Sequence, residues 1–168
     1  MRFVNELPEA EHVLDLGCGD GRLSAYLRAG TLTVADTSDV ALRRAEARLP
    51  DAEVVHVGPD EQLPFVDGEF ELVLCTETIE HVRDVQLFLS EVRRVLRPGG
   101  GLALSTPAHS RWTALLALAR GFESVFEPLS PHLRFFTRRS LARLLDAMGF
   151  EVDSIRRRGG TLLVRATR

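Results

Sequence analysis

A short apolar run that ends in three alternating glycines is the feature that most constrains this chain. Residues Val13–Leu16 are followed by glycines at positions 17, 19 and 21. The apolar run predicts a buried strand, and the glycines allow a sharp turn in which a ligand can approach the backbone closely. The spacing is G-x-G-x-G, and Arg22 stands where a dinucleotide-binding loop has its third glycine. The sequence therefore predicts a ligand-binding turn but disfavours a nicotinamide oxidoreductase.

Short apolar runs alternate with longer amphipathic stretches along the rest of the chain. The predicted strands cover residues 13–16, 32–35, 53–57, 70–75, 102–105, 150–157 and 161–166. The predicted helices cover residues 22–29, 38–49, 85–96 and 137–148. The last two strands have no long helix between them, so they are expected to pair antiparallel.

This alternation predicts an α/β fold. The expected architecture is a doubly wound, Rossmann-like, seven-stranded sheet that is mostly parallel with an antiparallel last strand. Residues 1–168 are expected to form a single domain, with residues 106–136 as an inserted lid or substrate-facing segment. Folds of this kind bind ligands beyond the carboxyl ends of their strands.

Composition excludes several functional classes. The net charge of -3 argues against a nucleic-acid partner, and the absence of lysine excludes a Schiff-base or phosphate-loop lysine. Cys18 and Cys75 lie in apolar runs, as buried reduced thiols do, and two cysteines cannot form a metal cage, so no metal is expected. With no signal peptide and no apolar run of about 18 residues, a cytoplasmic location without an integral membrane segment is expected.

Two acidic residues stand at the ends of the first two predicted strands. A carboxylate at Asp15 would repel a pyrophosphate but suits a cationic amino group. Asp36 lies 19 positions after Gly17 and can accept hydrogen bonds from both hydroxyls of a ribose. A nucleoside that carries an amino acid and no phosphate satisfies both requirements, and S-adenosylmethionine is such a ligand.

In these motifs the chain resembles the class I S-adenosylmethionine-dependent methyltransferases, and within them the type 11 group that includes the ubiquinone and menaquinone biosynthesis methyltransferases. The resemblance is carried by residues 13–21, 58–65, 70–82, 92–107 and 132–150. It implies methyl transfer from S-adenosylmethionine. The predicted cofactor-binding residues are Asp15, Gly17, Cys18, Gly19, Gly21, Asp36, Thr37, Asp60, Glu61, Gln62, Leu63, Cys75, Thr76 and Glu77.

Two departures from the pattern of that family affect the expected cofactor site. Pro59 stands where the family has an aspartate that accepts from the adenine amino group, and Asp60 is the candidate to replace it. Only about a dozen residues precede the first strand, where family members often carry one or two helices that cover the cofactor. The 106–136 segment or a partner subunit is expected to exclude water instead.

Methyl transfer from an activated donor needs alignment and shielding more than acid–base catalysis. His132 is the first candidate for a base or orienting group and His81 the second, although His81 also fits a packing or capping role. The 106–136 segment is rich in large apolar residues, namely Trp112, Leu115, Leu116, Leu118, Phe122, Val125 and Phe126. They predict either a small, apolar acceptor molecule or a core or homodimer face.

Two functional hypotheses follow. The first is an S-adenosylmethionine-dependent methyltransferase that acts on a small apolar metabolite. The alternative is a non-catalytic subunit or regulatory domain that binds S-adenosylmethionine or S-adenosylhomocysteine. The sequence Cys75-Thr76-Glu77-Thr78 lacks the proline-rich motif of nucleic-acid amino-methyltransferases, so that class is excluded.

Overall fold

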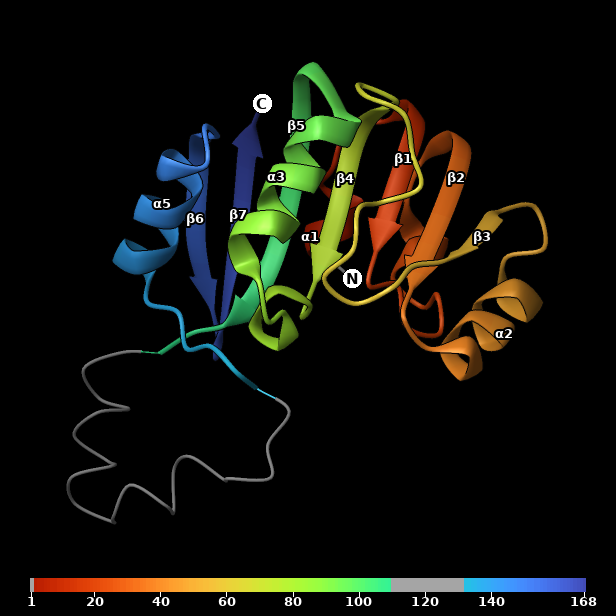
Figure 1. The fold of residues 1–168 in the computed structure, drawn as a ribbon, viewed down its shortest axis with the longest axis horizontal. Coiled ribbons are helices and arrows are strands. Elements are labelled where there is room, and N and C mark those ends of the chain that lie inside the picture. The colour runs from red at the N-terminus through yellow and green to blue at the C-terminus, as the bar shows by residue number, and fades with distance from the viewer. Residues whose placement is uncertain (1, 110–131) are drawn as a thin grey trace, which may run out of the picture.

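The computed structural model describes residues 2–109 and 132–168, which form a seven-stranded sheet with helices on both faces (Figure 1). The strand order is β3-β2-β1-β4-β5-β7-β6. The strands are β1 Ala10–Leu16, β2 Ala29–Asp36, β3 Glu53–His56, β4 Phe70–Thr76, β5 Leu96–Pro107, β6 Glu151–Arg158 and β7 Thr161–Thr167. The helices are α1 Arg2–Asn5, α2 Asp39–Arg48, α3 Val85–Val95 and α5 Arg138–Ala147, with short 3-10 turns η1 Ser24–Tyr26 and η2 Ile79–His81.

The pairing of the strands confirms the predicted fold class. Strands β1 to β5 pair in parallel, whereas β7 is antiparallel to both of its neighbours, β5 and β6. Strands β6 and β7 are joined only by Gly159 and Gly160, and so short a connection permits a hairpin but no parallel crossover. The five parallel strands therefore end at one common edge of the sheet.

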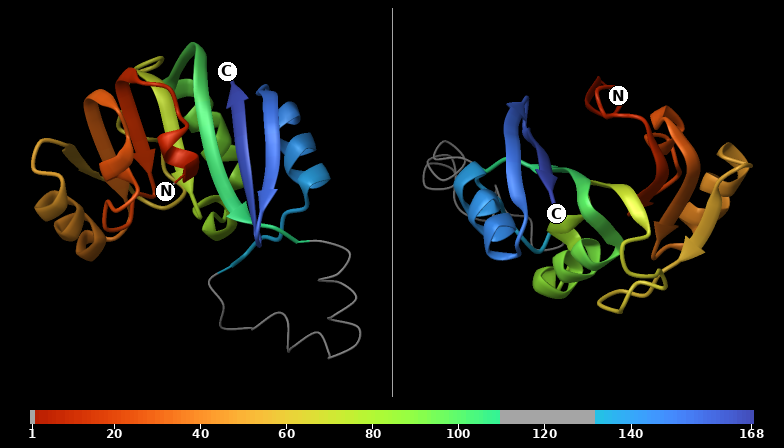
Figure 2. Two further views of the ribbon diagram at one scale, coloured as in Figure 1. Left: turned by 180° about the vertical axis from the view of Figure 1, so that it is seen from behind. Right: turned by 90° about the horizontal axis from the view of Figure 1, so that it is seen from above.

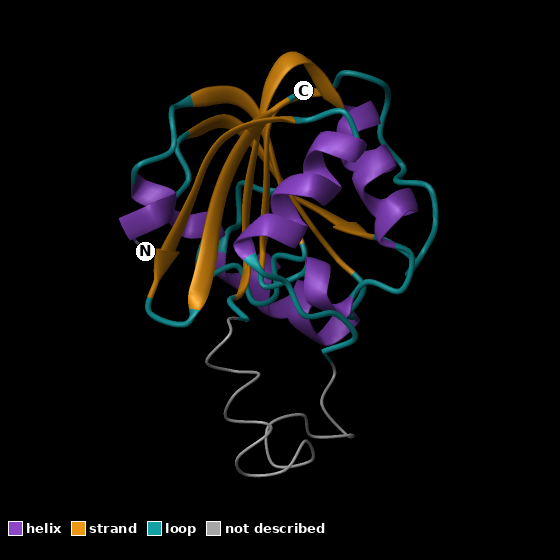
Figure 3. Ribbon diagram, turned by 90° about the vertical axis from the view of Figure 1, so that its left-hand side faces the viewer, coloured by secondary structure: helices purple, strands orange, loops and turns teal. Residues whose placement is uncertain are grey.

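The two faces of the sheet bury different sets of apolar side chains. On one face, α3 and α5 place Leu89, Val92 and Leu145 in the largest core cluster. On the other face, α1 and the residues after it pack Val4 and Leu7 against β1 and β4. Figure 2 shows α1 on the face opposite α3 and α5, and Figure 3 shows the sheet between them. Both faces are covered, as a largely parallel sheet requires.

Local signals predicted one helix correctly and another wrongly. Helix α5 begins at the expected cap, because the Thr137 and Ser140 side chains form a reciprocal capping box. The predicted helix over 22–29 is reduced to η1, since β2 already begins at Ala29, which pairs with Ala10. The few residues left before β2 cannot complete a longer helix and still return to the sheet.

The predicted helix over 85–96 and strand over 102–105 leave residues 97–101 as a connection, and the structure differs there. Helix α3 ends as expected, but β5 starts directly at Leu96, whose backbone is extended and which pairs with Phe70. The Pro-Gly-Gly sequence at 98–100 therefore lies inside β5, where the pairing with β4 changes register. Glycine is tolerated at such an irregularity because it lacks a side chain.

The two ends of the predicted 106–136 insertion are joined to each other by backbone contacts. Ala108 forms a parallel bridge with Phe136, and the His109 N–H donates to the Phe136 carbonyl at 2.8 Å. Residues 110–131, including the apolar residues predicted to form a lid, lie outside the described residues. Among the helices that the structure describes, none has the length and apolar character needed to span a bilayer.

Candidate cofactor site

A cavity of about 410 Å³ opens at the carboxyl ends of the parallel strands. This volume lies within the usual range for a small-molecule site. The predicted cofactor residues that line it are Gly17, Asp36, Thr37, Asp60, Glu61, Leu63 and Glu77. His81 lines it as well. The structure thus brings together residues from the ends of β1, β2, β3 and β4, as the binding rule for doubly wound sheets requires.

The glycine turn after β1 passes so close to the turn after β4 that a side chain would not fit. Gly17 has a φ of 80°, and a Cβ on it would overlap the Thr78 hydroxyl and lie 2.6 Å from the Thr78 Cγ2 atom. The Gly17 N–H donates to the Ala35 carbonyl at 2.7 Å, which fixes the start of the turn. Both the backbone conformation and the available space therefore require glycine at position 17.

Asp36 holds the glycine turn from the end of β2. Its Oδ2 atom accepts from the Gly19 N–H at 2.9 Å, and its Oδ1 atom accepts from the Ser38 N–H at 2.9 Å. Asp36 is half-buried and lines the cavity. Each carboxylate oxygen has a second lone pair, so Asp36 can accept two further hydrogen bonds from a ligand such as a ribose.

Asp15, which was predicted to bind the cofactor, does not line the cavity. Its side chain is 1% exposed, and its Oδ2 atom accepts from the Ser24 hydroxyl at 2.6 Å. Burial raises the pKa of Asp15 to about 7, against the opposing effect of the Ser24 hydrogen bond. Asp15 lies on the opposite face of β1 from Leu14 and Leu16, whose side chains belong to the largest core cluster. The hydrogen bond between Asp15 and Ser24 joins β1 to η1.

Several other predicted cofactor-binding residues are also absent from the lining of the cavity. These residues are Cys18, Gly19, Gly21, Gln62, Cys75 and Thr76. Cys18 and Cys75 are buried, and burial raises the pKa of Cys18 to about 12 and that of Cys75 well above its usual range. Both thiols therefore stay protonated and act as apolar core groups rather than as nucleophiles. Gly19 contributes through its backbone contact with Asp36.

The loop between β3 and β4 covers one side of the cavity. Asp60 has a φ of 57°, and its Oδ1 atom accepts from the Asp84 N–H at 3.0 Å. One oxygen of the residue predicted to replace the family's adenine-binding aspartate is thus used to join this loop to the start of α3. Pro59 also lines the cavity but offers no N–H to a ligand.

An ion pair on α3, which the sequence analysis missed, holds the same loop. The Glu91 Oε2 atom accepts from the Leu63 N–H at 2.9 Å, and Arg94 donates to the carbonyl oxygens of Leu63 and Phe65 at 2.9 and 2.8 Å. Arg94 and Glu91 also bind each other at 2.7 Å, and their hydrogen bonds lower the pKa of Glu91. Opposite charges three positions apart on a predicted helix were the available signal.

The end of β4 is tied to the end of β5 by Glu77 and Ser105. Glu77 has a φ of 51°, its N–H donates to the Ser105 carbonyl at 3.0 Å, and its Oε1 atom accepts from the Ser105 hydroxyl at 2.9 Å. A non-glycine residue in the left-handed region is uncommon and is a frequent feature of binding sites. Glu77 lines the cavity, so this conformation directs a carboxylate to the site.

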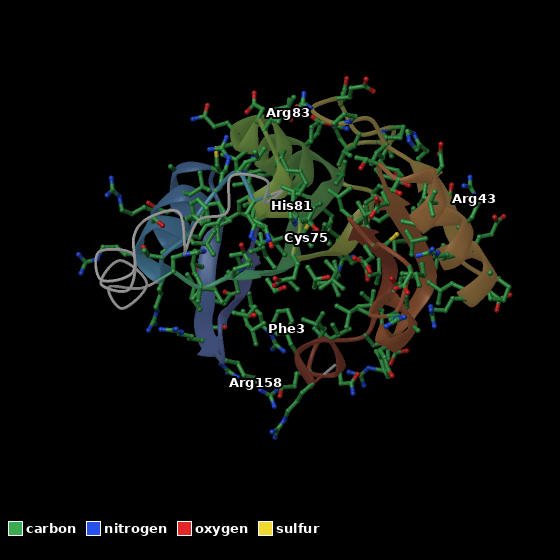
Figure 4. The ribbon with its side chains drawn as sticks, turned by 90° about the horizontal axis from the view of Figure 1, so that it is seen from below. Phe3, Arg43, Cys75, His81, Arg83 and Arg158 are labelled. Atoms are coloured by element: carbon green, nitrogen blue, oxygen red, sulfur yellow. The ribbon has the colours of Figure 1, made fainter. Side chains whose placement is uncertain are left out.

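The two candidate catalytic histidines lie next to each other. The rings of His81 and His132 have centroids 4.9 Å apart, and both side chains lie beside the buried Glu80. His81 lines the cavity. His132 does not line it but packs against the ring of His81. Figure 4, which looks onto the carboxyl ends of the strands, shows His81 and Cys75 near the middle of this edge.

Comparisons with known proteins show the family to which the chain belongs. The profile of a family described as a methyltransferase domain matches residues 1–155. The chain belongs to this family. It is 39% identical over 147 residues to an uncharacterized methyltransferase of Synechocystis sp., covering 84% of this chain and 68% of that protein. It is 30% identical over 153 residues to the ubiquinone biosynthesis O-methyltransferase of Thiobacillus denitrificans, covering 85% of this chain and 66% of that protein.

A further relative extends the range of acceptors found among such proteins. The malonyl-[acyl-carrier protein] O-methyltransferase of Pseudescherichia vulneris is 34% identical over 138 residues, covering 80% of this chain and 53% of that protein. The methyltransferase chain thus spans between about half and two thirds of the length of these curated relatives.

Solved structures share the fold of this methyltransferase over nearly its whole length. An S-adenosylmethionine-dependent methyltransferase of Methanosarcina mazei superposes with a TM-score of 0.76 at 25% identity, covering 98% of this chain and 95% of that one. A methyltransferase of Haloferax volcanii, solved in complex with an activator protein, gives a TM-score of 0.81 at 18% identity, covering 99% and 87%. By family and fold, the chain is an S-adenosylmethionine-dependent methyltransferase domain.

Proposed function

We propose that this domain transfers the methyl group of S-adenosylmethionine to a small apolar metabolite. The observation that carries the proposal is the position of Asp36, a carboxylate that lines the cavity while it holds the glycine turn. The cavity lining has six acidic residues and one arginine, Arg83, and this excess of negative charge suits a cationic, phosphate-free nucleoside better than a dinucleotide.

The residues of the cavity fit the parts of this cofactor. Asp36 has lone pairs for the ribose hydroxyls, and the cramped turn at Gly17 exposes backbone to the ligand. Val57 and Leu63 supply apolar surface for an adenine ring beside the loop that Glu91 and Arg94 hold. Glu77, in its left-handed conformation, offers a negative charge to the cationic end of the cofactor.

In this reaction the bound cofactor supplies an activated methyl group on a sulfonium. The chain itself must align an acceptor with that methyl group and keep water away. The hydrogen bond between Glu77 and Ser105 joins the ends of β4 and β5 beside the cavity. His81 borders the cavity, and His132 packs against the His81 ring. The two imidazoles are therefore in place to orient the acceptor or remove its proton.

The sequence of the 110–131 segment and the names of the relatives support the proposed acceptor class. Seven large apolar residues between Trp112 and Phe126 favour an apolar molecule. Two of the relatives carry names of O-methyltransferases, which favours oxygen as the atom that receives the methyl group. We therefore place hydroxylated aromatic compounds and carboxylic acids first among the candidate acceptors.

The experiment that tests the proposal separates cofactor binding from transfer. S-Adenosylhomocysteine is titrated into the protein by calorimetry, with NAD as the control ligand. Transfer of labelled methyl from S-adenosylmethionine to a panel of apolar phenols and carboxylic acids is then followed by mass spectrometry. Binding with transfer supports the proposal, binding without transfer to any acceptor supports the non-catalytic alternative, and preference for NAD overturns both.

A further inference from the structure

Three potential metal ligands converge beside the cofactor cavity from two distant parts of the chain. Glu80 and His81 belong to η2 after β4, and His132 lies in the segment that leads to α5. One ligand atom from each side chain can be chosen so that all three lie within 4.8 Å of one another. The two cysteines of the sequence predicted no metal site, and the separation of His132 from Glu80 and His81 along the chain gave no sign of this convergence.

The backbone holds the His132 segment against η2. The N–H groups of Leu133 and Arg134 both donate to the Glu80 carbonyl, at 2.8 and 3.2 Å. The Arg134 guanidinium donates to the carbonyl oxygens of Val82, at 3.2 Å, and of Arg83. The approach of His132 to Glu80 and His81 is therefore built into main-chain pairing and does not depend on the side chains alone.

Glu80 is a buried carboxylate whose hydrogen bonding is incomplete. It is 1% exposed, and its Oε2 atom accepts from the Thr106 hydroxyl at 3.0 Å. Its Oε1 atom has no hydrogen-bond partner in the part of the chain that the structure describes. Burial raises the pKa of Glu80. A buried carboxylate with an unsatisfied oxygen costs free energy, and a cation at this position would remove that cost.

We propose that Glu80, His81 and His132 bind a divalent transition-metal ion of the Zn²⁺ type. Two imidazoles and one carboxylate form a ligand set that suits zinc and neighbouring metals but not Mg²⁺ or Ca²⁺, which prefer oxygen ligands alone. Bonds of about 2.1 Å in a tetrahedral site place the ligand atoms about 3.4 Å apart. Side-chain rotations that move these atoms by roughly 1 Å would bring them to that separation.

Each histidine keeps a nitrogen for another contact when it binds a metal. A metal-bound imidazole normally uses its second ring nitrogen for a hydrogen bond that fixes the ring. The proposal is therefore compatible with hydrogen bonds of His81 and His132 to other groups. The Thr106 hydroxyl fixes the Oε2 atom of Glu80 by a hydrogen bond, while among the described residues the Oε1 atom has no hydrogen-bond partner.

The metal would serve the acceptor side of the reaction. Three protein ligands leave an open coordination position, and His81 borders the cavity, so an oxygen of the acceptor can complete the coordination sphere. A metal ion lowers the pKa of a bound hydroxyl, whose proton passes to solvent. This role rests on the proposed function, whereas metal binding itself can be measured without it.

The test measures metal binding by the untagged chain after treatment with a chelator. Zn²⁺ is titrated by calorimetry, and Co²⁺ is titrated as a coloured probe whose visible spectrum reports nitrogen ligands and geometry. We expect one ion per chain, with binding weakened at least about tenfold in His81→Ala and in His132→Ala. His12→Ala is the matched control, since His12 is exposed on β1 and belongs to no cluster of potential metal ligands within residues 2–109 and 132–168.

The outcomes distinguish this inference from the proposed function. No Zn²⁺ binding to the wild-type chain, or equal affinity in His81→Ala, His132→Ala and His12→Ala, overturns the metal site. S-Adenosylhomocysteine affinity of the metal-free protein tests the cofactor site independently. Glu80→Gln should also weaken Zn²⁺ binding. Because Glu80 is buried, the folding of this variant is checked by circular dichroism, and the two histidine variants decide the test if it does not fold.

Discussion

The Asp36 carboxylate accepts a hydrogen bond from the Gly19 N–H, so the end of β2 holds the turn that follows β1. The parallel register makes this contact possible, because Leu16 pairs with Ala35 and the two strands end side by side. One side chain thereby shapes the glycine turn and lines the cavity. Cofactor binding and the conformation of the turn are therefore linked through Asp36.

Replacing Asp36 with asparagine is expected to weaken S-adenosylhomocysteine binding by roughly 10- to 100-fold. The change removes the charge and one acceptor, and a hydrogen bond to a charged group contributes about 1.5–3 kcal/mol. Calorimetric titration measures the effect. Asp51→Asn, an exposed carboxylate in the turn before β3, is the control and should bind as the wild type does. Unchanged affinity in Asp36→Asn would remove Asp36 from the cofactor site.

Gly17→Ala is expected to destabilise the fold more than Gly99→Ala. Both glycines have positive φ, 80° and 76°, so both alanines carry the backbone cost of about 1–2 kcal/mol. Only the Cβ at position 17 would overlap Thr78, whereas nothing lies within 4 Å of a Cβ at position 99. Urea unfolding of the two variants measures the difference. Equal free energies of unfolding would show that Thr78 moves aside without cost.

The buried Asp15 is expected to make stability fall as the pH rises through 7. Its pKa is about 7 in the folded protein and near 3.8 when unfolded, so between these values only the folded state holds the proton. Stability from this group is complete below about pH 4 and is lost as the pH passes 7. From pH 5 to pH 8 the loss is roughly 2–3 kcal/mol.

Asp15→Asn cannot titrate and isolates this contribution. Urea unfolding of wild type and Asp15→Asn at pH 5 and pH 8 should show a smaller pH dependence in the variant. Asp51→Asn serves again as the exposed control and should follow the wild type. A variant with the same pH dependence as the wild type would mean that Asp15 is charged at neutral pH in the folded protein.

Glu91→Gln is expected to loosen the loop that covers the cavity. The glutamine can still accept from Leu63 but loses the ion pair with Arg94, which lowers the free energy of unfolding by roughly 1–3 kcal/mol. Since the pKa of Glu91 is lowered, this contribution is present at neutral pH and is lost as the pH falls through that lowered pKa.

The Glu91→Gln variant should also bind S-adenosylhomocysteine several-fold more weakly, because Leu63 lines the cavity. Urea unfolding and calorimetric titration measure the two effects. Glu46→Gln, on the exposed side of α2, is the control for loss of a charge. A variant that is less stable yet binds with wild-type affinity would show that the loop does not contribute to the cofactor site.

Local patterns predicted most elements, and the failures have identifiable causes. Strands β1 and β4 each contain a short run rich in apolar residues, and α5 has a cap at Thr137, so each could be recognised from neighbouring residues. The helix expected over 22–29 depended on the room left before β2, which pairing with β1 decides. The contacts of Arg94 with Leu63 and Phe65 join segments that are distant in the sequence, so spacing alone could not reveal them.

By itself, the sequence determined the alternation of strands and helices, the glycine turn, and the acidic residue at the end of β2. Each depends on backbone preferences and side-chain periods that act over a few residues. Only the tertiary structure decided that the Asp15 side chain is buried and that His132 lies beside Glu80 and His81. Burial and convergence depend on the path of the whole chain, because a side chain's neighbours in space come from elements far away in sequence.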